Sequence, residues 1–380
     1  RILFSLRRFL REAGRLLSIG DRKILNLRDL ILSFSSLPDK YNGWLIPAVA
    51  AGLRAIKRTR AGVIYSSAPY FTSHLAGYCL SLLTGAPWVA HFRDPWITGA
   101  LETLRPDNKI CFRIDRALER MAISRADAVI CVTEEHATLM RAAYDRKAGD
   151  RTAASKFAVV MNGFDGLEWQ EAVESLRQDT PGAADGPRKF RITYAGELYM
   201  KRNPAPLFRA LRFLIDRGEI GRNEAIVELI GSCKSSEGRS IADIISEAGV
   251  EECVVTPGRL GHSETLRRLL QSDLLLLLAE ELVVQIPGKT FEYLKTRRPI
   301  LALTGEGAVA TLLRRTGGAW VVNPNDQPGV INAVRECYRL WKYGLPAPAP
   351  DQMIVESFDR RKTTGRIAEL LDFLVSSKSA

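Results

Sequence analysis

The residues best suited to chemistry lie together in one short segment that opens a predicted helix. The segment follows an unbroken apolar run at 274–279 and contains Pro287, Gly288, Lys289, Thr290 and Glu292. Proline and glycine predict a turn, and the first backbone N–H groups of the following helix have no intrahelical partner. With the Lys289 charge these groups could face a bound anion, while the Glu292 carboxylate, on the same side, could accept hydrogen bonds from sugar hydroxyls. The segment therefore predicts a site for a phosphate and a sugar; the alternative is an ordinary helix with a solvated Glu292.

A second candidate is the pair Arg93 and Asp94, which follows an apolar strand predicted at 88–92. Adjacent charges at the end of a buried strand are unusual unless they are paired or used. Arg93 could hold a phosphate, and Asp94 could act as a base or orient an acceptor hydroxyl. The alternative is an ion pair that ties two loops together. Small residues at 66–69, at the end of the preceding strand, could also contact a ligand.

Two further loops combine glycine with positive charge. Gly196 and Glu197 follow a predicted strand, and Lys201 and Arg202 come just before the next predicted helix. Glycine permits close approach of the backbone, and two cations could neutralise a leaving diphosphate. A loop at 257–262, which includes Arg259, could form the edge of a nucleobase pocket.

All of these loops come at the carboxyl ends of predicted strands, where open parallel sheets bind ligands. Apolar strands alternate with helical segments along the chain, which predicts α/β domains with doubly wound parallel sheets. The expected strands lie at 62–67, 88–92, 128–132, 157–161, 190–195, 225–230, 253–256, 274–278, 299–303 and 320–322. A polar, turn-rich stretch at 169–189 predicts a linker between two Rossmann-like domains, over residues 1–175 and 188–350. A closing amphipathic helix is expected at 361–375.

The composition is typical of a globular protein and argues against a metal site. The chain has 380 residues, and its six cysteines are scattered without a CxxC pair, which favours reduced thiols and a cytosolic setting. No Asp-x-Asp pair occurs, and the four histidines are not clustered as metal ligands. His74, His136 and His262 lie in or beside predicted helices without an obvious partner, so structural or surface roles are expected for them. No apolar run approaches the about 20 residues of a membrane-spanning helix.

Positive charge is concentrated near the N-terminus. Residues 1–60 contain thirteen Lys or Arg and four Asp or Glu, which is +9 of the net charge of +11. Such a surface should attract anions, for example phospholipid headgroups or a phosphorylated acceptor. Residues 1–20 predict a basic amphipathic helix that lies on a membrane or, as we favour, packs on its own domain. Nucleic acid is not expected, because no aromatic residues are interleaved with the cations.

Four stretches in this order resemble the GT-B glycosyltransferases of family 4: SSAPYFTSHLAGYCLSLLTGAPWVAHFRDPW, MNGFD, YAGELYMKRNP and IPGKTFEYLKTRRPILALT. The resemblance runs from Tyr41 to Trp320. It implies two Rossmann-like domains that face a cleft, with the acceptor on the N-terminal domain and the nucleotide-sugar on the C-terminal one. It also implies that part of the helix within 355–380 packs back on the N-terminal domain. The Gly-rich loop of the family's first strand is not found, so the N-terminal sheet is expected to lack its first strand or strands.

The resemblance also suggests roles for individual residues. Glu292 matches the glutamate that holds the donor ribose, and the segment from Gly288 to Thr290 falls where the donor phosphate or sugar is met. Lys201 or Arg202 matches the basic residue that meets the diphosphate. Two positions depart from the pattern: Arg93 stands where many members have a functional histidine, and Val284 replaces the first glutamate of a pair.

The resemblance implies a retaining, metal-independent hexosyltransferase-like enzyme without a cofactor, whose donor is a UDP-, GDP- or ADP-sugar. The acceptor is expected to be a glycan or a lipid-linked hydroxyl compound of cell-envelope polysaccharide biosynthesis. The expected location is the cytoplasm, at the inner face of the membrane if the basic surface binds it. Two alternatives stay open: a nucleotide-sugar epimerase of the same fold, and a weakly catalytic nucleotide-sugar-binding partner protein.

Overall fold

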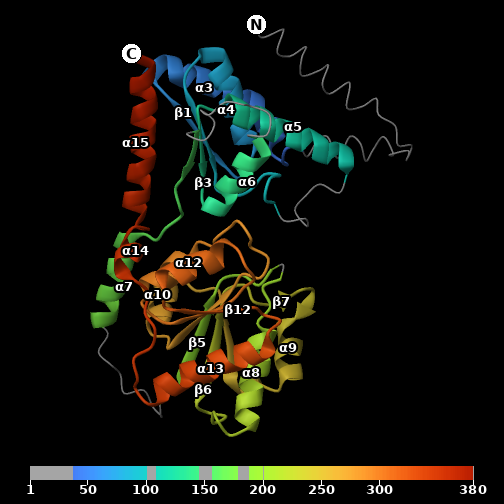
Figure 1. Ribbon diagram of the computed structural model, residues 1–380, viewed down its shortest axis with the longest axis vertical. Coiled ribbons are helices and arrows are strands. Elements are labelled where there is room, and N and C mark those ends of the chain that lie inside the picture. The colour runs from blue at the N-terminus through green and yellow to red at the C-terminus, as the bar shows by residue number, and fades with distance from the viewer. Residues whose placement is uncertain (1–36, 101–107, 145–155, 179–187, 200, 380) are drawn as a thin grey trace. The chain divides into compact units, whose positions relative to one another are not determined.

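The computed structural model describes residues 37–100, 108–144, 156–178, 188–199 and 201–379 (Figure 1). The chain divides into two compact units. The first comprises the described part of Arg1–Val160 together with Ile367–Ala380, and the second is Met161–Arg366. Both are α/β units built on a parallel sheet, as the alternation of strands and helices predicts.

The first unit contains a four-stranded parallel sheet in chain order, β1-β2-β3-β4. Its strands are β1 (Ile64–Ala68), β2 (Trp88–Phe92), β3 (Ala128–Cys131) and β4 (Phe157–Val159). Its helices before the chain leaves the unit are η1 (Asn42–Trp44), α3 (Leu45–Thr59), α4 (Thr72–Thr84), α5 (Lys109–Arg125) and α6 (Glu134–Tyr144). Every residue of β2 and β3 is buried, which explains why these strands are apolar throughout.

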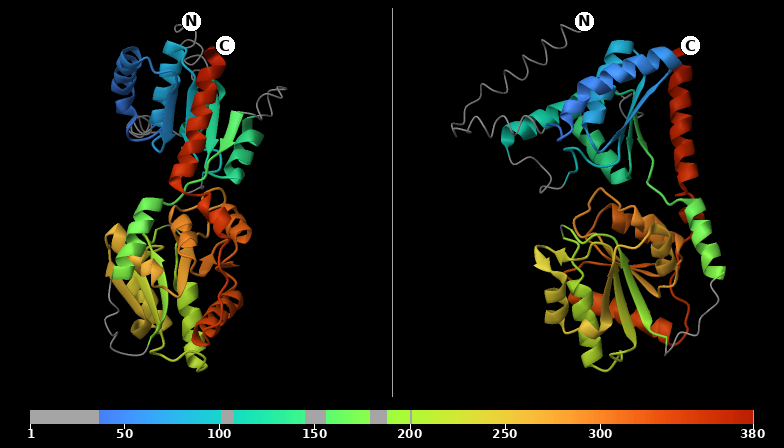
Figure 2. Two further views of the ribbon diagram at one scale, coloured as in Figure 1. Left: turned by 90° about the vertical axis from the view of Figure 1, so that its left-hand side faces the viewer. Right: turned by 180° about the vertical axis from the view of Figure 1, so that it is seen from behind.

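The two faces of this sheet are covered by different parts of the chain. On one face α4, α5 and α6 supply Leu75, Leu118 and Met140 to a core around Trp88 and Phe92. On the other face, Ile367, Leu370, Leu371 and Leu374 of α15 (Arg360–Ser379) pack against Val89, Ala128, Ile130 and Val160. Figure 2 shows α15 lying across the strands of this unit. The apolar stripe of the last helix therefore completes the core of the first unit.

The second unit contains a six-stranded parallel sheet in the order β12-β11-β10-β5-β6-β9. Its strands are β5 (Phe190–Ala195), β6 (Ala225–Ile230), β9 (Val254–Gly258), β10 (Leu274–Leu278), β11 (Ile300–Leu303) and β12 (Ala319–Val322). Its helices are α7 (Gly166–Gln178), α8 (Ala205–Asp216), α9 (Ile241–Ala248), η5 (Glu251–Cys253), α10 (His262–Leu270), α11 (Lys289–Lys295), α12 (Ala308–Thr316), α13 (Gln327–Lys342) and α14 (Gln352–Glu356).

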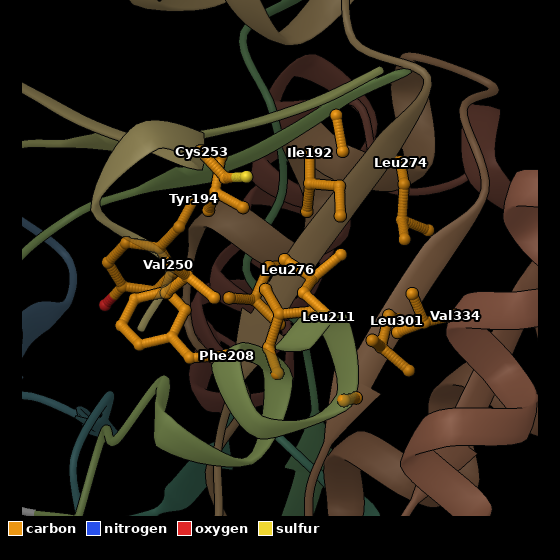
Figure 3. Packing of buried hydrophobic residues seen from close by; sticks show 14 of the residues in the cluster. Ile192, Tyr194, Phe208, Leu211, Val250, Cys253, Leu274, Leu276, Leu301 and Val334 are labelled. Atoms are coloured by element: carbon orange, nitrogen blue, oxygen red, sulfur yellow. The ribbon is translucent and has the colours of Figure 1, made fainter. Parts of the chain in front are cut away.

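The central strand β10 shows why its sequence is five leucines. Leu274, Leu276 and Leu278 belong to the core beneath α8, α9 and α13, whereas Leu275 and Leu277 belong to the core beneath α10, α11 and α12. All five are at most 2% exposed, so both faces of the strand are buried. Figure 3 shows Leu276 and Leu301 of the sheet packed with Leu211 of α8 and Val334 of α13.

The structure differs from the sequence-based expectations in three places. The linker expected at 169–189 is wrong in its first part, because residues up to Gln178 form α7, whose Trp169 and Ala172 are buried. A small hairpin, β7 (Ser235–Ser236) and β8 (Arg239–Ser240), and the short helix α14 were not predicted. The amphipathic helix expected over residues 1–20 lies outside the described residues. No helix in the described ranges has both the length and the hydrophobicity to cross a membrane.

Candidate donor site

Close backbone contacts at the carboxyl ends of β5, β6 and β9 explain the glycines that follow these strands. Gly196 N–H donates to Ile230 O at 2.8 Å, and Gly231 N–H donates to Gly258 O at 2.8 Å. A Cβ on Gly231 would lie 2.1 Å from Gly196 O, and Gly231 has a φ of +123° that side chains disfavour. Only glycine therefore lets the chain close this edge of the sheet.

Helix α11 is fixed to the last residue of β5 through two side chains. Ala195 N–H donates to the Tyr293 hydroxyl at 2.8 Å, and Lys289 Nζ donates to Ala195 O at 3.0 Å. Tyr293 is fully buried, so the first bond satisfies a polar group that would otherwise be costly. These bonds hold the start of α11 beside the end of β5.

Lys289 is the most unusual charge in this region. The residue keeps some exposed surface, but its ammonium group is enclosed: it lies 3.7 Å from the centroid of the Tyr194 ring. Burial, followed by the charge of Arg202, lowers the pKa of Lys289 well below its ordinary value. No Asp or Glu among the described residues forms an ion pair with it. A bound anion would favour the charged form of this enclosed amine.

Glu292 lies one helical turn from Lys289, and its side chain is 21% exposed. Burial raises the pKa of Glu292, while the charges of His262 and Arg360 act in the opposite direction. His262, for which we expected no partner, faces two carboxylates: its Nε2 lies 3.1 Å from Glu168 Oε2 and 3.8 Å from Glu292 Oε1. The contact joins α7, α10 and α11, and no local sequence signal connects these three positions.

The other cations predicted for this site are partly engaged. Lys201 pairs with Glu281 at 2.5 Å, and Arg259 pairs with Glu197. Arg202 stacks on Tyr199, with its guanidinium carbon 3.9 Å from the ring centroid. Exposed ion pairs of this kind are weak and exchange readily. Lys201 and Arg259 can therefore be drawn to a ligand only by leaving Glu281 and Glu197.

The start of α11 is less open than its sequence predicts. We expected free N–H groups from Gly288 to Thr290, but Thr290 N–H donates to Pro287 O at 2.9 Å. Thr290 is fully buried, and its hydroxyl has no partner among the described residues. Gly288 is exposed, and a Cβ on it would meet open space. Val284, which replaces the first glutamate of the paired motif, is only 3% exposed and belongs to the interior.

Arg93 and Asp94 lie in the first unit, just beyond β2. Arg93 is exposed, and its N–H donates to Ala68 O at 3.1 Å, which joins the ends of β1 and β2. Its charge acts on Tyr65 and His91, whose hydroxyl and Nδ1 are 2.5 Å apart. Burial, the larger effect, and then the Arg93 charge lower the pKa of His91 to about 4. His91 is therefore a neutral neighbour of Arg93 near pH 7.

The other two histidines expected to be structural lie inside the first unit. His74 is fully buried, and its Nδ1 is 2.8 Å from Ser66 Oγ, which also accepts a bond from Trp88 Nε1. His136 is fully buried as well. Burial lowers the pKa of His74 to about 3 and that of His136 to about 4, so both are neutral at physiological pH.

The predicted site coincides neither with a metal-ligand cluster of the described residues nor with a cavity found in the second unit. In the described ranges, no group of three or more His, Cys, Asp or Glu side chains could hold a metal ion. A cavity of about 530 Å³ lies at the far end of α11, between Trp169, Arg177 and Lys295. None of the predicted site residues lines it.

Comparison with known proteins identifies the fold. Residues 32–154 match the family model described as "Glycosyl transferase 4-like domain". No curated protein matches the chain in a sequence comparison. Among solved structures, HepE from Anabaena in complex with UDP has a TM-score of 0.59 at 18% identity, over 86% of this chain and 82% of HepE.

Two further structures show the same architecture. Sucrose-phosphate synthase from Thermosynechococcus elongatus has a TM-score of 0.61 at 16% identity. The match covers 89% of this chain and 80% of the synthase. The α,α-trehalose-phosphate synthase (UDP-forming) from Burkholderia vietnamiensis has a TM-score of 0.61 at 13% identity, with 90% and 77% coverage. The chain therefore has the GT-B fold of glycosyltransferases, and its N-terminal part matches a glycosyl transferase 4-like domain.

Proposed function

We propose that the protein is a retaining, metal-independent glycosyltransferase that moves a sugar from a nucleoside-diphosphate sugar to a hydroxyl acceptor. The observation that carries the proposal is the pairing, on one turn of α11, of the enclosed Lys289 and the half-buried Glu292 beside the end of β5. A cation without a carboxylate partner suits a diphosphate, and a carboxylate nearby suits ribose hydroxyls. Retention and independence from metal rest on the family resemblance.

In this proposal the second unit binds the donor. Lys289 and Arg202 compensate the charge that develops on the diphosphate as the bond between sugar and phosphate breaks. Glu292 accepts hydrogen bonds from the ribose and fixes the nucleotide. Gly196 lets the Lys289 ammonium lie close to the backbone, because a Cβ on Gly196 would be 3.0 Å from Lys289 Nζ.

The proposed chemistry is a displacement on one face of the sugar. The acceptor oxygen forms a bond to the anomeric carbon as the diphosphate leaves from the same side, and a phosphate oxygen takes the acceptor proton. The protein supplies position and positive charge rather than a nucleophile. Arg93 and Asp94 of the first unit are proposed to orient the acceptor, which is a glycan or a lipid-linked compound.

We propose UDP as the nucleotide, because HepE, of the same fold, has been crystallised with UDP, with UDP and glucose, and with UDP-glucose. At 18–20% identity this likeness supports the fold, so GDP- and ADP-sugars must be tested beside UDP-sugars.

The first unit also suggests contact with an anionic membrane, which would suit a lipid-linked acceptor at the cytoplasmic face. Residues 41–93 contain no Asp or Glu, and α3 exposes Arg54, Lys57 and Arg58. Trp44 and Ile46 at its other end are 56% and 80% exposed. Sedimentation with phosphatidylglycerol vesicles at low salt should capture the protein, and 0.5 M salt should release it. Absence of binding at low salt would remove the membrane from the proposal.

The function is tested by measuring the release of nucleoside diphosphate from UDP-glucose, GDP-mannose and ADP-glucose in the presence of EDTA. Each donor is incubated with and without oligosaccharide and polyprenyl-phosphate-sugar acceptors. We expect nucleoside diphosphate release that depends on an acceptor, and an anomeric proton coupling in the product that matches the donor. Glu292→Gln should lower this rate at least tenfold, whereas Glu174→Gln, an exposed carboxylate of α7, should not. Conversion of the donor without any acceptor would favour an epimerase instead.

A further inference from the structure

A histidine stands between two carboxylates at the candidate donor site. His262 is the first residue of α10, Glu168 lies in the first turn of α7, and Glu292 lies in the first turn of α11. His262 Nε2 is 3.1 Å from Glu168 and 3.8 Å from Glu292. Both neighbours of this nitrogen are carboxylates, so the tautomer that carries a proton on Nε2 is favoured. The Nε2 edge of the ring therefore faces both Glu168 and Glu292.

The contact does little for the stability of the fold. The His262 and Glu168 side chains are 50% and 51% exposed, and ion pairs at such exposure contribute little to stability. Glu292 is different, since its side chain is 21% exposed and burial raises its pKa. His262 should therefore affect mainly the ionisation and the orientation of the Glu292 carboxylate.

Four charged groups act on Glu292 from the elements around it. His262 of α10, Arg360 of α15 and Lys289 of α11 favour the carboxylate, and Glu168 of α7 opposes it. Arg360 is anchored elsewhere: its Nε donates to Gly163 O at 3.2 Å. Lys289 is committed to Ala195 O. Of the cations in this set, His262 is the one that lies within 4 Å of a Glu292 oxygen, with Nε2 3.8 Å from Oε1.

We propose that His262, held by Glu168, is a positioning residue that presents the Glu292 carboxylate to the ribose and so sets the preference of the donor site for nucleotides with an intact ribose diol. The inference rests on the proposed function and names the residues that make its ribose recognition selective. A carboxylate that must accept two hydroxyl hydrogen bonds has to be ionised and fixed in one orientation before the ligand arrives. Without the imidazole, no group of the described residues lies between the Glu292 and Glu168 carboxylates to compensate their repulsion.

The test compares UDP with 2′-deoxy-UDP by isothermal titration calorimetry at pH 7.5. The wild type should prefer UDP by about tenfold or more, because a site built to bind a hydroxyl rejects the analogue that lacks it. Glu292→Gln should remove most of this preference. His262→Ala should weaken the binding of UDP by about three- to tenfold and leave the affinity for 2′-deoxy-UDP nearly unchanged. In the double variant His262→Ala/Glu292→Gln the loss should not exceed that of Glu292→Gln alone.

Control variants separate positioning from folding and from direct contact. Glu168→Gln should give an intermediate loss of preference, His262→Gln should restore part of it through its side-chain N–H, and Glu174→Gln on the same helix as Glu168 should have no effect. If His262→Ala binds both nucleotides as the wild type does while Glu292→Gln loses the preference, the inference is wrong and the donor site stands. If His262→Ala binds both nucleotides more weakly by the same factor, His262 contacts the base or the phosphate, and the inference is also wrong. If UDP, GDP and ADP all fail to bind the wild type, the proposed function and the inference fail together.

Discussion

Asp115 provides a quantitative test of how the first unit is packed. This carboxyl on α5 is 4% exposed and accepts a hydrogen bond from Trp96 Nε1 at 3.2 Å. Burial, the largest effect, raises its pKa from 3.8 to about 7, and the charges of Glu119 and Asp39 act in the same direction. Glu119, one turn away, instead accepts bonds from the backbone N–H groups of Ile97 and Thr98 at 3.0 and 3.1 Å.

The raised pKa has a definite consequence for stability. The folded state holds a proton on Asp115 that the unfolded state has lost, so the stabilisation is fully present below pH 3.8 and disappears as the pH rises through about 7. One pKa unit corresponds to about 1.4 kcal/mol, which gives a loss of about 2–3 kcal/mol between pH 5 and pH 8. Asp115→Asn, which keeps the shape and an acceptor for Trp96, should remove this dependence.

The measurement is urea denaturation of the wild type and Asp115→Asn at several pH values from 5 to 8, followed by tryptophan fluorescence. We expect the difference in the free energy of unfolding, variant minus wild type, to grow by about 2–3 kcal/mol across this range. Asp216→Asn, an exposed carboxylate of α8, serves as the control and should show no such trend. A difference that stays constant from pH 5 to 8 would refute the argument that burial holds a proton on Asp115.

Three further predictions concern the second unit. Gly231→Ala should destabilise the protein by more than about 2 kcal/mol in urea denaturation, because its Cβ would lie 2.1 Å from Gly196 O. Gly238→Ala, where φ is +77° and the Cβ would meet open space, should cost about 1 kcal/mol. Leu276→Ala should lower the free energy of unfolding by about 2–5 kcal/mol, since Leu276 is fully buried; a loss below 1 kcal/mol would contradict its central place in the core. Lys289→Met should change the free energy of unfolding by no more than about 2 kcal/mol, because the desolvation cost that it removes offsets the lost hydrogen bond to Ala195. The same variant should weaken the binding of UDP at least tenfold in calorimetry. An unchanged affinity would exclude Lys289 from the site.

The strands and the fold class could be predicted because their signals are local. A run such as Leu274 to Leu278 can be satisfied only where both faces of a strand are buried, and the structure places it there. The prediction of a linker from residue 169 was wrong for a related reason. The stretch after Trp169 is polar, but Trp169 and Ala172, three residues apart, are enough to bury one side of α7.

The elements that carry the candidate residues could be predicted, but their contacts could not. Strand ends and a proline–glycine turn indicated where α11 begins, and Lys289 and Glu292 were chosen as candidates because they share this helix. The contact of His262 with Glu168 joins positions 94 residues apart, so it depends on how α7 and α10 pack. The bond from Thr290 N–H to Pro287 O was missed because a tight turn consumes a donor that an ideal helix start would leave free.

The most direct test of the central claim is thermal unfolding of the protein in the presence of UDP, GDP and ADP, beside a Glu292→Ala variant. A ligand that binds only the folded state stabilises it by about 2.7 kcal/mol at a concentration one hundred times its dissociation constant. We expect one of the three nucleotides, UDP first, to raise the unfolding temperature of the wild type and to have little effect on Glu292→Ala. If none of them stabilises the wild type, or if Glu292→Ala responds as fully as the wild type, the donor site does not lie at the start of α11.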